Sequence, residues 1–214
     1  MKIAIIGATG DMGYGLALRL AIAGHDIIIG SRQLEKAENA AVKAREESGK
    51  TNIIGMANPD AARAAELVVI SVPSAGHRAT VEGLKDIIAE KPVLDITIPM
   101  AFKPLRYAPP AEGSNALETQ AVLGEGSRVA AGFHTISATL LSDLSHPVTG
   151  DALIVGDDAE LKEQVIGLAK ELGLNAYNAG ALRFSSTVES LTPMLIGMNK
   201  RYGSNHMGII ITGA

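Results

Sequence analysis

The sequence of 214 residues contains no cysteine and no tryptophan, and aromatic residues make up only 3% of it. The absence of cysteine excludes disulfides, thiolate metal sites and a cysteine nucleophile. So few aromatic rings argue against a nucleic-acid surface built on base stacking. Positive charge is also scarce, because 19 Lys and Arg residues stand against 23 Asp and Glu residues and leave a net charge of −4. The chain therefore has no overall positive field that would attract nucleic acid.

Long apolar segments are missing as well. The longest stretch without Asp, Glu, Lys or Arg covers residues 129–142, whereas a transmembrane helix needs about 18 or more apolar residues. The apolar run after Lys2 is soon interrupted by Gly7, Gly10 and Asp11, which is unlike a secretory signal. We therefore expect a soluble, cytoplasmic protein that neither spans a membrane nor binds nucleic acid.

The chain does contain a regular alternation of short apolar runs and amphipathic segments. The apolar runs predict strands at residues 2–6, 26–30, 52–56, 66–72, 92–96, 128–133, 152–156 and 174–177. The amphipathic segments predict helices at residues 12–23, 34–47, 59–65, 77–89, 116–123, 159–172 and 182–199. Asn58 is the expected N-cap of the third helix, and the proline-rich residues 99–115 are expected to form a long loop. This pattern predicts an α/β fold with a doubly wound parallel sheet, that is, a Rossmann fold with a small C-terminal helical extension.

A glycine-rich loop joins the first predicted strand to the first helix. Gly7, Gly10 and Gly13 follow the spacing Gly-x-x-Gly-x-x-Gly, a variant of the dinucleotide-binding fingerprint. In that interpretation Gly7 makes the tight turn, Gly10 lets a pyrophosphate approach the helix N-terminus, and Gly13 lets helix and strand pack closely. The alternative is a turn that merely requires glycines.

The residues after the second strand indicate which nucleotide is bound. An NAD site has Asp or Glu at this point to hold the ribose hydroxyls, but this sequence has Ser31 and Arg32, with Lys36 one turn later. A guanidinium, an ammonium and a hydroxyl suit the 2′-phosphate of NADP. The alternative is a solvated basic turn at the start of a surface helix.

Taken together, several motifs resemble those of the archaeal NADPH:coenzyme F420 oxidoreductases. The motifs are Gly-Ala-Thr-Gly-Asp-Met-Gly at residues 7–13, Gly-Ser-Arg at 30–32 with Lys36, Val-Pro at 72–73, Gly-Phe-His-Thr-Ile at 132–136 and Val-Glu-Ser-Leu-Thr-Pro at 188–193. The similarity covers nearly the whole chain. It implies a reversible hydride transfer between NADPH and coenzyme F420, an 8-hydroxy-5-deazaflavin.

The resemblance also implies roles for individual residues. The pyrophosphate would be held by Thr9, Gly10, Asp11 and Met12, and the 2′-phosphate by Ser31, Arg32 and Lys36. The nicotinamide would be flanked by Val72, Ile98 and Ala138. The deazaflavin site would be lined by His134, Thr135, Ile136, Ser190, Thr192 and Met207. Residues 1–150 would then form the NADP-binding domain, and residues 151–214 a smaller part that helps to form the deazaflavin site.

Two positions depart from the family pattern. Ser137 stands where proline is expected, and Ser186 stands where arginine is expected, with Arg183 one turn earlier as a candidate substitute. His134 is the candidate orienting residue, and its alternative interpretation is a buried imidazole bonded to the backbone. Ser190 and Thr192 could equally bond their own helix. His25, His77, His146 and His206 are scattered singly and are expected at the surface.

Hydride transfer between two ring systems requires no metal, carboxylate pair or nucleophile, and we expect none near the predicted strand ends. Two alternatives remain open at this point. One is another NADP-dependent reductase related to the pyrroline-carboxylate reductases, although residues after Gly180 are few for the usual helical domain. The other is a non-catalytic NADP-sensing module. The apolar C-terminal residues 209–211 suggest a homodimer or a higher homo-oligomer.

Overall fold

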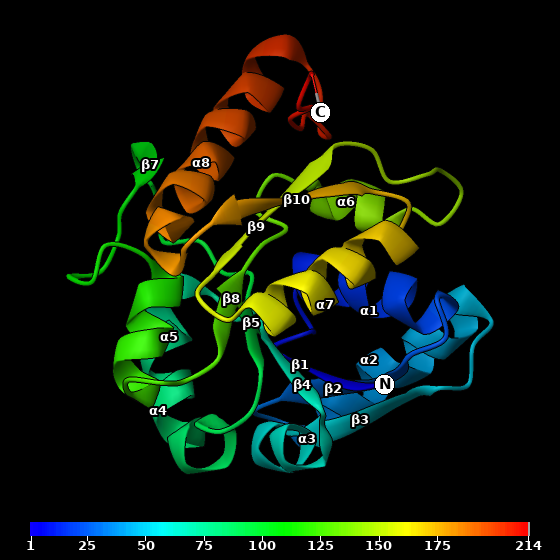
Figure 1. The fold of residues 1–214 in the computed structure, drawn as a ribbon. Helices are drawn as coiled ribbons and strands as arrows, with labels where there is room; N and C mark the ends of the chain where they lie inside the picture. The colour runs from blue at the N-terminus through cyan, green and yellow to red at the C-terminus, as the bar shows by residue number, and fades with distance from the viewer. Residues whose placement is uncertain (214) are drawn as a thin grey trace.

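The structure, a computed structural model, describes residues 1–213. The strands of the main sheet are β1 (Lys2–Ile6), β2 (Asp26–Ser31), β3 (Ile53–Ala57), β4 (Leu67–Ile70), β5 (Val93–Asp95), β8 (Val129–Ala131), β9 (Asp151–Gly156) and β10 (Asn175–Gly180). Their order in the eight-stranded sheet is β10-β9-β8-β5-β4-β1-β2-β3 (Figure 1). A separate two-stranded hairpin consists of β6 (Met100–Phe102) and β7 (Leu105–Tyr107).

Helices cover both faces of the sheet, as a doubly wound fold requires. One face packs against α1 (Asp11–Ile22), α2 (Leu34–Ser48), α6 (Ala138–Ser142) and α7 (Ala159–Glu171). The other face packs against α3 (Asn58–Ala64), α4 (His77–Ile88), α5 (Asn115–Leu123) and the start of α8 (Ser185–Tyr202), which follows a 3₁₀ turn at Leu182–Phe184. Two hydrophobic cores result, one on each side of the sheet.

The first strand shows why the apolar runs are continuous. Ile3 and Ile5 belong to the core under α1, whereas Ala4 and Ile6 belong to the core under α3. Because a central parallel strand is buried on both faces, all four positions must be apolar. The Rossmann-like α/β fold that the sequence predicts is confirmed.

The sheet is not parallel throughout, and in this respect the prediction was wrong. β8 pairs with β9 in antiparallel fashion, while β9 and β10 are parallel to each other. If two neighbouring strands are parallel, the connection between them must cross over and carry the chain back to the opposite end of the strands. Residues 132–150 contain only the five-residue helix α6. The chain does not cross back, and β9 starts beside the carboxyl end of β8.

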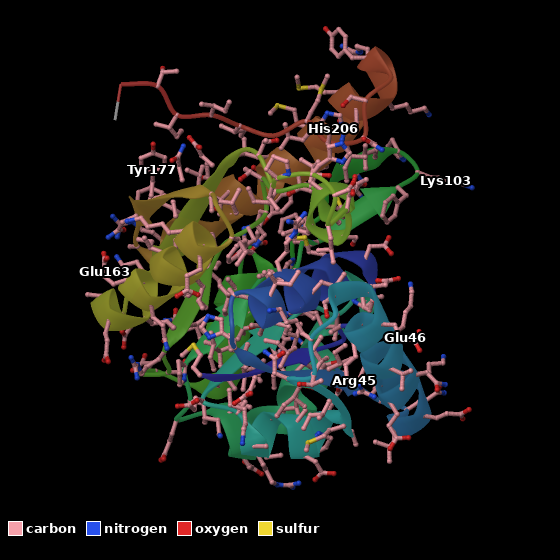
Figure 2. The ribbon with its side chains drawn as sticks, turned by 90° about the vertical axis from the view of Figure 1, so that its right-hand side faces the viewer. Arg45, Glu46, Lys103, Glu163, Tyr177 and His206 are labelled. Carbon is pink, nitrogen blue, oxygen red and sulfur yellow. The ribbon has the colours of Figure 1, made fainter. Side chains whose placement is uncertain are left out.

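Two local predictions were also wrong, and one short helix was not predicted. Residues 99–115 are not a plain loop, since they contain the β6–β7 hairpin, whose three-residue strands are too short for a hydrophobic alternation to be seen. Lys103 at the tip of the hairpin projects away from the body of the molecule (Figure 2). Asn58 does not cap α3, because it is the first helical residue and Ala57 is the N-cap. The short helix α6 was not expected at all.

The C-terminal segment after α8 turns back toward β9 (Figure 1). The Ile209 carbonyl accepts a hydrogen bond of 2.8 Å from the Asp151 amide, and the Ile211 amide donates one of 2.6 Å to Asp151 Oδ2. Residues 205–207 thereby lie over the end of α8, where the Met207 amide donates to Asn199 Oδ1. No helix within residues 1–213 is long and apolar enough to cross a membrane.

Candidate active site

The glycine-rich loop turns between β1 and α1 as its spacing predicts. Gly7 has a φ of +85°, and a Cβ there would lie 2.7 Å from Val72 Cγ1. A Cβ on Gly13 would lie 2.9 Å from Ala8 Cα, so helix and loop approach too closely for a side chain. At Gly10, by contrast, an added Cβ would meet nothing closer than 3.8 Å. Gly10 therefore borders open space at the N-terminus of α1.

A cleft of about 520 Å³ lies beside this loop, beyond the carboxyl ends of β1, β2 and β4. It is lined by Gly7, Thr9, Gly10, Ser31, Arg32, Gln33, Lys36, Asn58, Val72, Pro73, Ala75, Gly76 and Thr80. The first amides of α1 have no carbonyl partner within the helix, and no side chain among the described residues caps this end. These amides and the helix dipole are available to an anion in the cleft.

Two cations stand at the β2 side of the cleft. Arg32 and Lys36 are exposed, and within residues 1–213 neither makes an ion pair. Ser31, nearly buried at the end of β2, accepts a hydrogen bond of 3.2 Å from the Gln33 amide at Oγ. Ser31 does not cap α2, whose N-cap is Gln33. The three residues expected to hold a 2′-phosphate thus line one cleft.

An apolar slot of about 350 Å³ adjoins the cleft at Ser31, Arg32 and Asn58. Its other walls are small or aliphatic, with Ala57, Pro59, Gly76, Ala79, Thr80, Gly83 and Leu84. Asn58 is 6% exposed, and its Oδ1 atom is buried without a hydrogen-bond partner among the described residues. The sequence offered no reason to place this residue at the site.

A second depression, which we call the ring pocket, lies on the other side of the glycine loop and encloses about 240 Å³. Residues far apart in the sequence line it, namely Met12, Ile96, Ile98, Phe133, His134, Thr135, Ile136, Ser137, Ala138, Thr139, Thr192, Leu195, Ile196, Asn199, Asn205 and Met207. The pocket thus unites the ends of β5 and β8, the start of α6, the second half of α8 and the C-terminal segment. Eight of the predicted site residues meet there.

Not every predicted residue lies where its assigned role would place it. Asp11 faces a third hollow, with Tyr14, Lys43 and Asp143, rather than the cleft. Ser190 lies outside the ring pocket and donates to the Thr187 carbonyl of its own helix. For Ser190 the bond to its own helix, the alternative interpretation, is therefore the one observed.

Thr192 and Thr135 line the ring pocket and also hold its walls together. Thr192 Oγ1 donates to the His134 carbonyl at 2.7 Å, which ties α8 to the segment after β8. Thr135 Oγ1 donates to the Asp151 carbonyl at 2.8 Å. Arg183, the candidate substitute for the missing arginine, instead lies over the Phe184 ring and does not line the pocket.

His134 is the one strongly buried titratable group in the lining of the ring pocket. It is 4% exposed, and neither ring nitrogen has a hydrogen-bond partner among the described residues. Burial lowers its pKa to about 4, although the charge of Asp95 and the backbone of Thr97 act in the opposite direction. The imidazole is therefore neutral at pH 7. Phe133, just before it, has a φ of +65°, a backbone conformation that is rare outside glycine and concentrates at functional sites.

Behind the ring pocket lies a buried ionic cluster, which the sequence analysis missed. His77 is fully buried, so its expected surface position was wrong, whereas His146 and His206 are exposed as expected. Its Nε2 lies 2.8 Å from Asp95 Oδ2 and its Nδ1 lies 2.6 Å from Glu118 Oε2. Burial lowers the pKa of His77, but the two carboxylates outweigh that effect and raise it to about 9. The expectation of no carboxylate pair near the strand ends was therefore wrong, since Asp95 is the last residue of β5.

A family model and the full-length relatives point to the same family. Residues 2–99 match the family described as NADP oxidoreductase, coenzyme F420-dependent. The chain is similar to the F420-dependent NADP reductase of Methanocaldococcus jannaschii, with 44% identity over 99% of this chain and 98% of that protein. It is 41% identical to the F420-dependent NADP reductase of Methanothermobacter thermautotrophicus, over 99% and 95% of the two chains. The solved structure of a protein from Arthrobacter sp. FB24, proposed to be such a reductase, has a TM-score of 0.85 at 28% identity and covers 99% of both chains.

Proposed function

This chain belongs to the family of coenzyme F420-dependent NADP oxidoreductases, and on that premise we propose that it transfers a hydride between NADPH and coenzyme F420 where the cleft and the ring pocket meet. The observation that carries the proposal is the position of the glycine loop between the two. Gly10 borders the cleft, whereas Met12, two residues later, lines the ring pocket. A dinucleotide lying over the N-terminus of α1 would therefore reach from one depression into the other.

The cleft suits the phosphates and the adenosine of NADP. Arg32 and Lys36 supply two cations without competing partners among the described residues, and no carboxylate lines the cleft. A guanidinium fork binds a phosphate in two parallel hydrogen bonds, which favours NADP over NAD. The slot beside Arg32 has small and aliphatic walls that suit a purine ring, and Asn58 offers it an unpartnered Oδ1.

The ring pocket suits two stacked ring systems. Its walls are mostly apolar, with Ile96 and Ile98 after β5, Ile136 after β8, and Leu195 and Ile196 of α8. The hydroxyls of Thr135 and Thr192 already donate to carbonyl groups. The ring nitrogens of His134 have no partner among the described residues, so they can bond to a ligand. A dihydronicotinamide held against a deazaflavin supplies the hydride without help from a metal or a nucleophile.

The protein then contributes by holding and orienting the two ring systems and by excluding water from them. Ile98 and Ala138 flank the nicotinamide end, while His134, Ile136 and Met207 contact the deazaflavin. Because His134 is neutral at pH 7, it orients a ring through a hydrogen bond rather than serving as a cationic acid. Holding two reactants at near-attack separation lowers a barrier by roughly 7–11 kcal/mol.

The C-terminal residues 151–214 form part of this proposal, because α8 and residues 205–207 supply one wall of the ring pocket. β8 before residue 150 and β9 after it are neighbouring strands of the main sheet, so the two parts of the chain share one sheet. We also propose that the protein forms a homo-oligomer and that it is cytoplasmic. The exposed apolar side chains of Met194, Met198 and Ile210 support the former, and light scattering in solution tests it.

The direct test follows the absorbance of oxidised coenzyme F420 at 420 nm on addition of NADPH. Bleaching, with a deuterium label moving from carbon 4 of NADPH to the deazaflavin, is the expected result. A protein that binds NADPH but leaves the 420 nm band unchanged would be a sensing module or a reductase of another substrate. Appearance of the label in water would contradict direct hydride transfer.

A further inference from the structure

The two walls of the ring pocket are joined by buried polar groups that do not line the pocket. One wall is carried by the segment after β5, in which Ile96 and Ile98 face the pocket and Thr97 lies between them. The other wall is carried by α8. Thr97 and Glu189 are 4% and 0% exposed and neither lines the pocket. What connects these two residues therefore sets how far apart the walls stand.

The first wall is held by Asp95, which is fully buried and accepts four hydrogen bonds. Its Oδ1 accepts from the Thr97 amide at 2.9 Å and from Thr97 Oγ1 at 2.5 Å. Its Oδ2 faces away from the pocket segment and accepts from His77 Nε2 and from Thr119 Oγ1 at 2.7 Å. Burial raises the pKa of Asp95, but His77 and the hydroxyl donors outweigh it and keep the carboxylate ionised.

The second wall is held by Glu189, which anchors α8 to the start of α5. Glu189 Oε2 accepts from the Asn115 amide at 3.0 Å and from the Tyr107 hydroxyl at 3.1 Å. Its Oε1 accepts from the Ala116 amide at 3.2 Å. These are the amides of the first turn of α5, which have no partner within their own helix. Glu189 lies one turn before the first residue of α8 that lines the pocket, Thr192.

Asn115 closes the connection, because it contacts both sides. Its Nδ2 donates to Thr97 Oγ1 at 2.8 Å, while its backbone amide donates to Glu189. Asn115 is 1% exposed, so no solvent competes with either bond. A continuous buried chain thus runs from Asp95 through Thr97 and Asn115 to Glu189. None of these four residues lines the cleft or the ring pocket.

We propose that this chain, with Asn115 at its centre, positions the deazaflavin for hydride transfer by fixing the separation of the two walls of the ring pocket. Thr97, Asn115 and Glu189 are then positioning residues for the reaction. The inference rests on the proposed function. It adds Thr97 and Asn115, which lie outside the family motifs, and a structural role for Glu189, which lies within one of them. Buried hydrogen bonds of this kind restrict the side chains that they join, and a displacement of about 1 Å at a reacting centre can cost about 100-fold in rate.

Two threonines on the same carboxylate make a matched test. Thr97→Val removes the hydroxyl that links Asp95 to Asn115, whereas Thr119→Val removes an equally buried hydroxyl from the other oxygen of Asp95. Both changes have the same chemistry, so both should lower Tm by a similar few degrees. Only Thr97→Val should slow hydride transfer, by roughly 10- to 100-fold in a single turnover. Thr97→Ser should restore the rate.

Asn115→Ala provides a second, independent variant, because it keeps the backbone bond to Glu189 and removes only the bond to Thr97. Its single-turnover rate should fall as in Thr97→Val, while the Kd for NADPH, measured by fluorescence titration, should stay within about twofold of the wild type. A Thr119→Val protein as slow as Thr97→Val would overturn the inference, since general loosening would then explain both. So would a normal rate in Thr97→Val and Asn115→Ala when the wild type is active. A wild-type protein that fails to bleach coenzyme F420 would overturn the proposed function, and this inference with it.

Discussion

Two buried histidines show how neighbouring groups decide the state of a residue. His77 lies between Asp95 and Glu118 and holds a proton up to about pH 9. His134 has no carboxylate within hydrogen-bond reach among the described residues, and burial keeps it neutral above about pH 4. Only the second lies in the ring pocket. The charged histidine is therefore part of a buried ionic cluster, and the neutral one lines the ring pocket.

Arg32 should decide the choice between NADP and NAD. A charge-assisted hydrogen bond contributes about 1.5–3 kcal/mol, so Arg32→Ala should weaken NADPH binding at least about tenfold and leave NADH binding almost unchanged. Fluorescence titration with both nucleotides measures this. Lys50→Ala is the control, because it removes an exposed positive charge just beyond the same helix without touching the cleft. An equal loss for both nucleotides would mean that Arg32 supports the fold instead.

His134 should contribute orientation and not acid catalysis. His134→Ala should lower kcat by roughly 10- to 100-fold, rather than the ~10⁴-fold lost when a triad base is disabled. Because the wild-type imidazole is neutral across pH 5.5–8, the shape of the pH–rate profile should be the same in both proteins. Steady-state rates at 420 nm over that range provide the measurement. A limb of the profile that disappears in His134→Ala would show that this residue transfers a proton.

Sequence motifs located the residues that line the cleft and the ring pocket better than the buried residues that hold them in place. Arg32, His134 and Thr192 belong to motifs with a recognisable pattern, and the structure places them in the cleft and the ring pocket. His77 and Asn115 have no such pattern, because their partners come from other elements. A lone histidine on a helix is indistinguishable in sequence from a solvated one. Its burial follows only from how α4, α5 and β5 pack.

At the scale of elements, the segment 132–150 determines the shape of the site. A hydrophobic pattern identifies a strand but not its direction, so the reversal of β9 could not be read from the sequence. The physical cause is that residues 132–150, which connect β8 to β9, stay at the carboxyl ends of the parallel strands. By staying there they bring α6 and residues 133–139 to the glycine loop, and they thereby create one side of the ring pocket.

Arg19 of α1 fixes this segment to the nucleotide-binding part. Its guanidinium donates to the carbonyl oxygens of Leu140, Leu141, Asp143 and His146 at distances of 2.5–3.1 Å. These include the last carbonyls of α6, which have no partner within their helix. One side chain thus satisfies two of the last carbonyls of α6 and two carbonyls just beyond it.

Arg19→Met should therefore destabilise the protein by about 2–3 kcal/mol, since hydrogen bonds from a charged donor are lost while the apolar stem is kept. Urea unfolding measures the loss, and amide hydrogen exchange should accelerate most within residues 138–146. The control substitution Arg63→Met removes an exposed ion pair with Asp60, and it should change the free energy of unfolding by less than about 1 kcal/mol. Uniform acceleration of exchange over the whole chain would contradict a local role for Arg19.

At the scale of the whole molecule, the buried ions couple the site to global stability. Asp95, His77 and Glu118 join β5, α4 and α5, and Arg78 bonds to the outer oxygen of Glu118. Burial, together with the charge of Asp95, raises the pKa of Glu189 to about 8. Unfolding exposes all of these groups to water at once. The free energy of unfolding must therefore depend on their protonation.

The sign of this dependence follows from His77. An unfolded histidine loses its proton near pH 6.5, whereas His77 in the folded protein keeps its proton up to about pH 9. The stabilisation is fully present below pH 6.5 and is lost as the pH rises to about 9, and the interval corresponds to on the order of 3 kcal/mol. Glu189 shifts stability in the same direction over a lower range, because its folded pKa is also raised.

Comparison with His77→Gln separates the two contributions, since Glu189 is present in both proteins. A glutamine side chain cannot gain or lose a proton, so the stability difference between wild type and His77→Gln should be largest near pH 6 and should shrink toward pH 9. Urea unfolding at pH 6, 7.5 and 9 with constant ionic strength gives this difference directly, and any remaining slope in the variant belongs to Glu189 and the other groups. A difference that stays constant with pH would mean that His77 is neutral in the folded protein and that packing alone, not charge, holds β5 to α4 and α5.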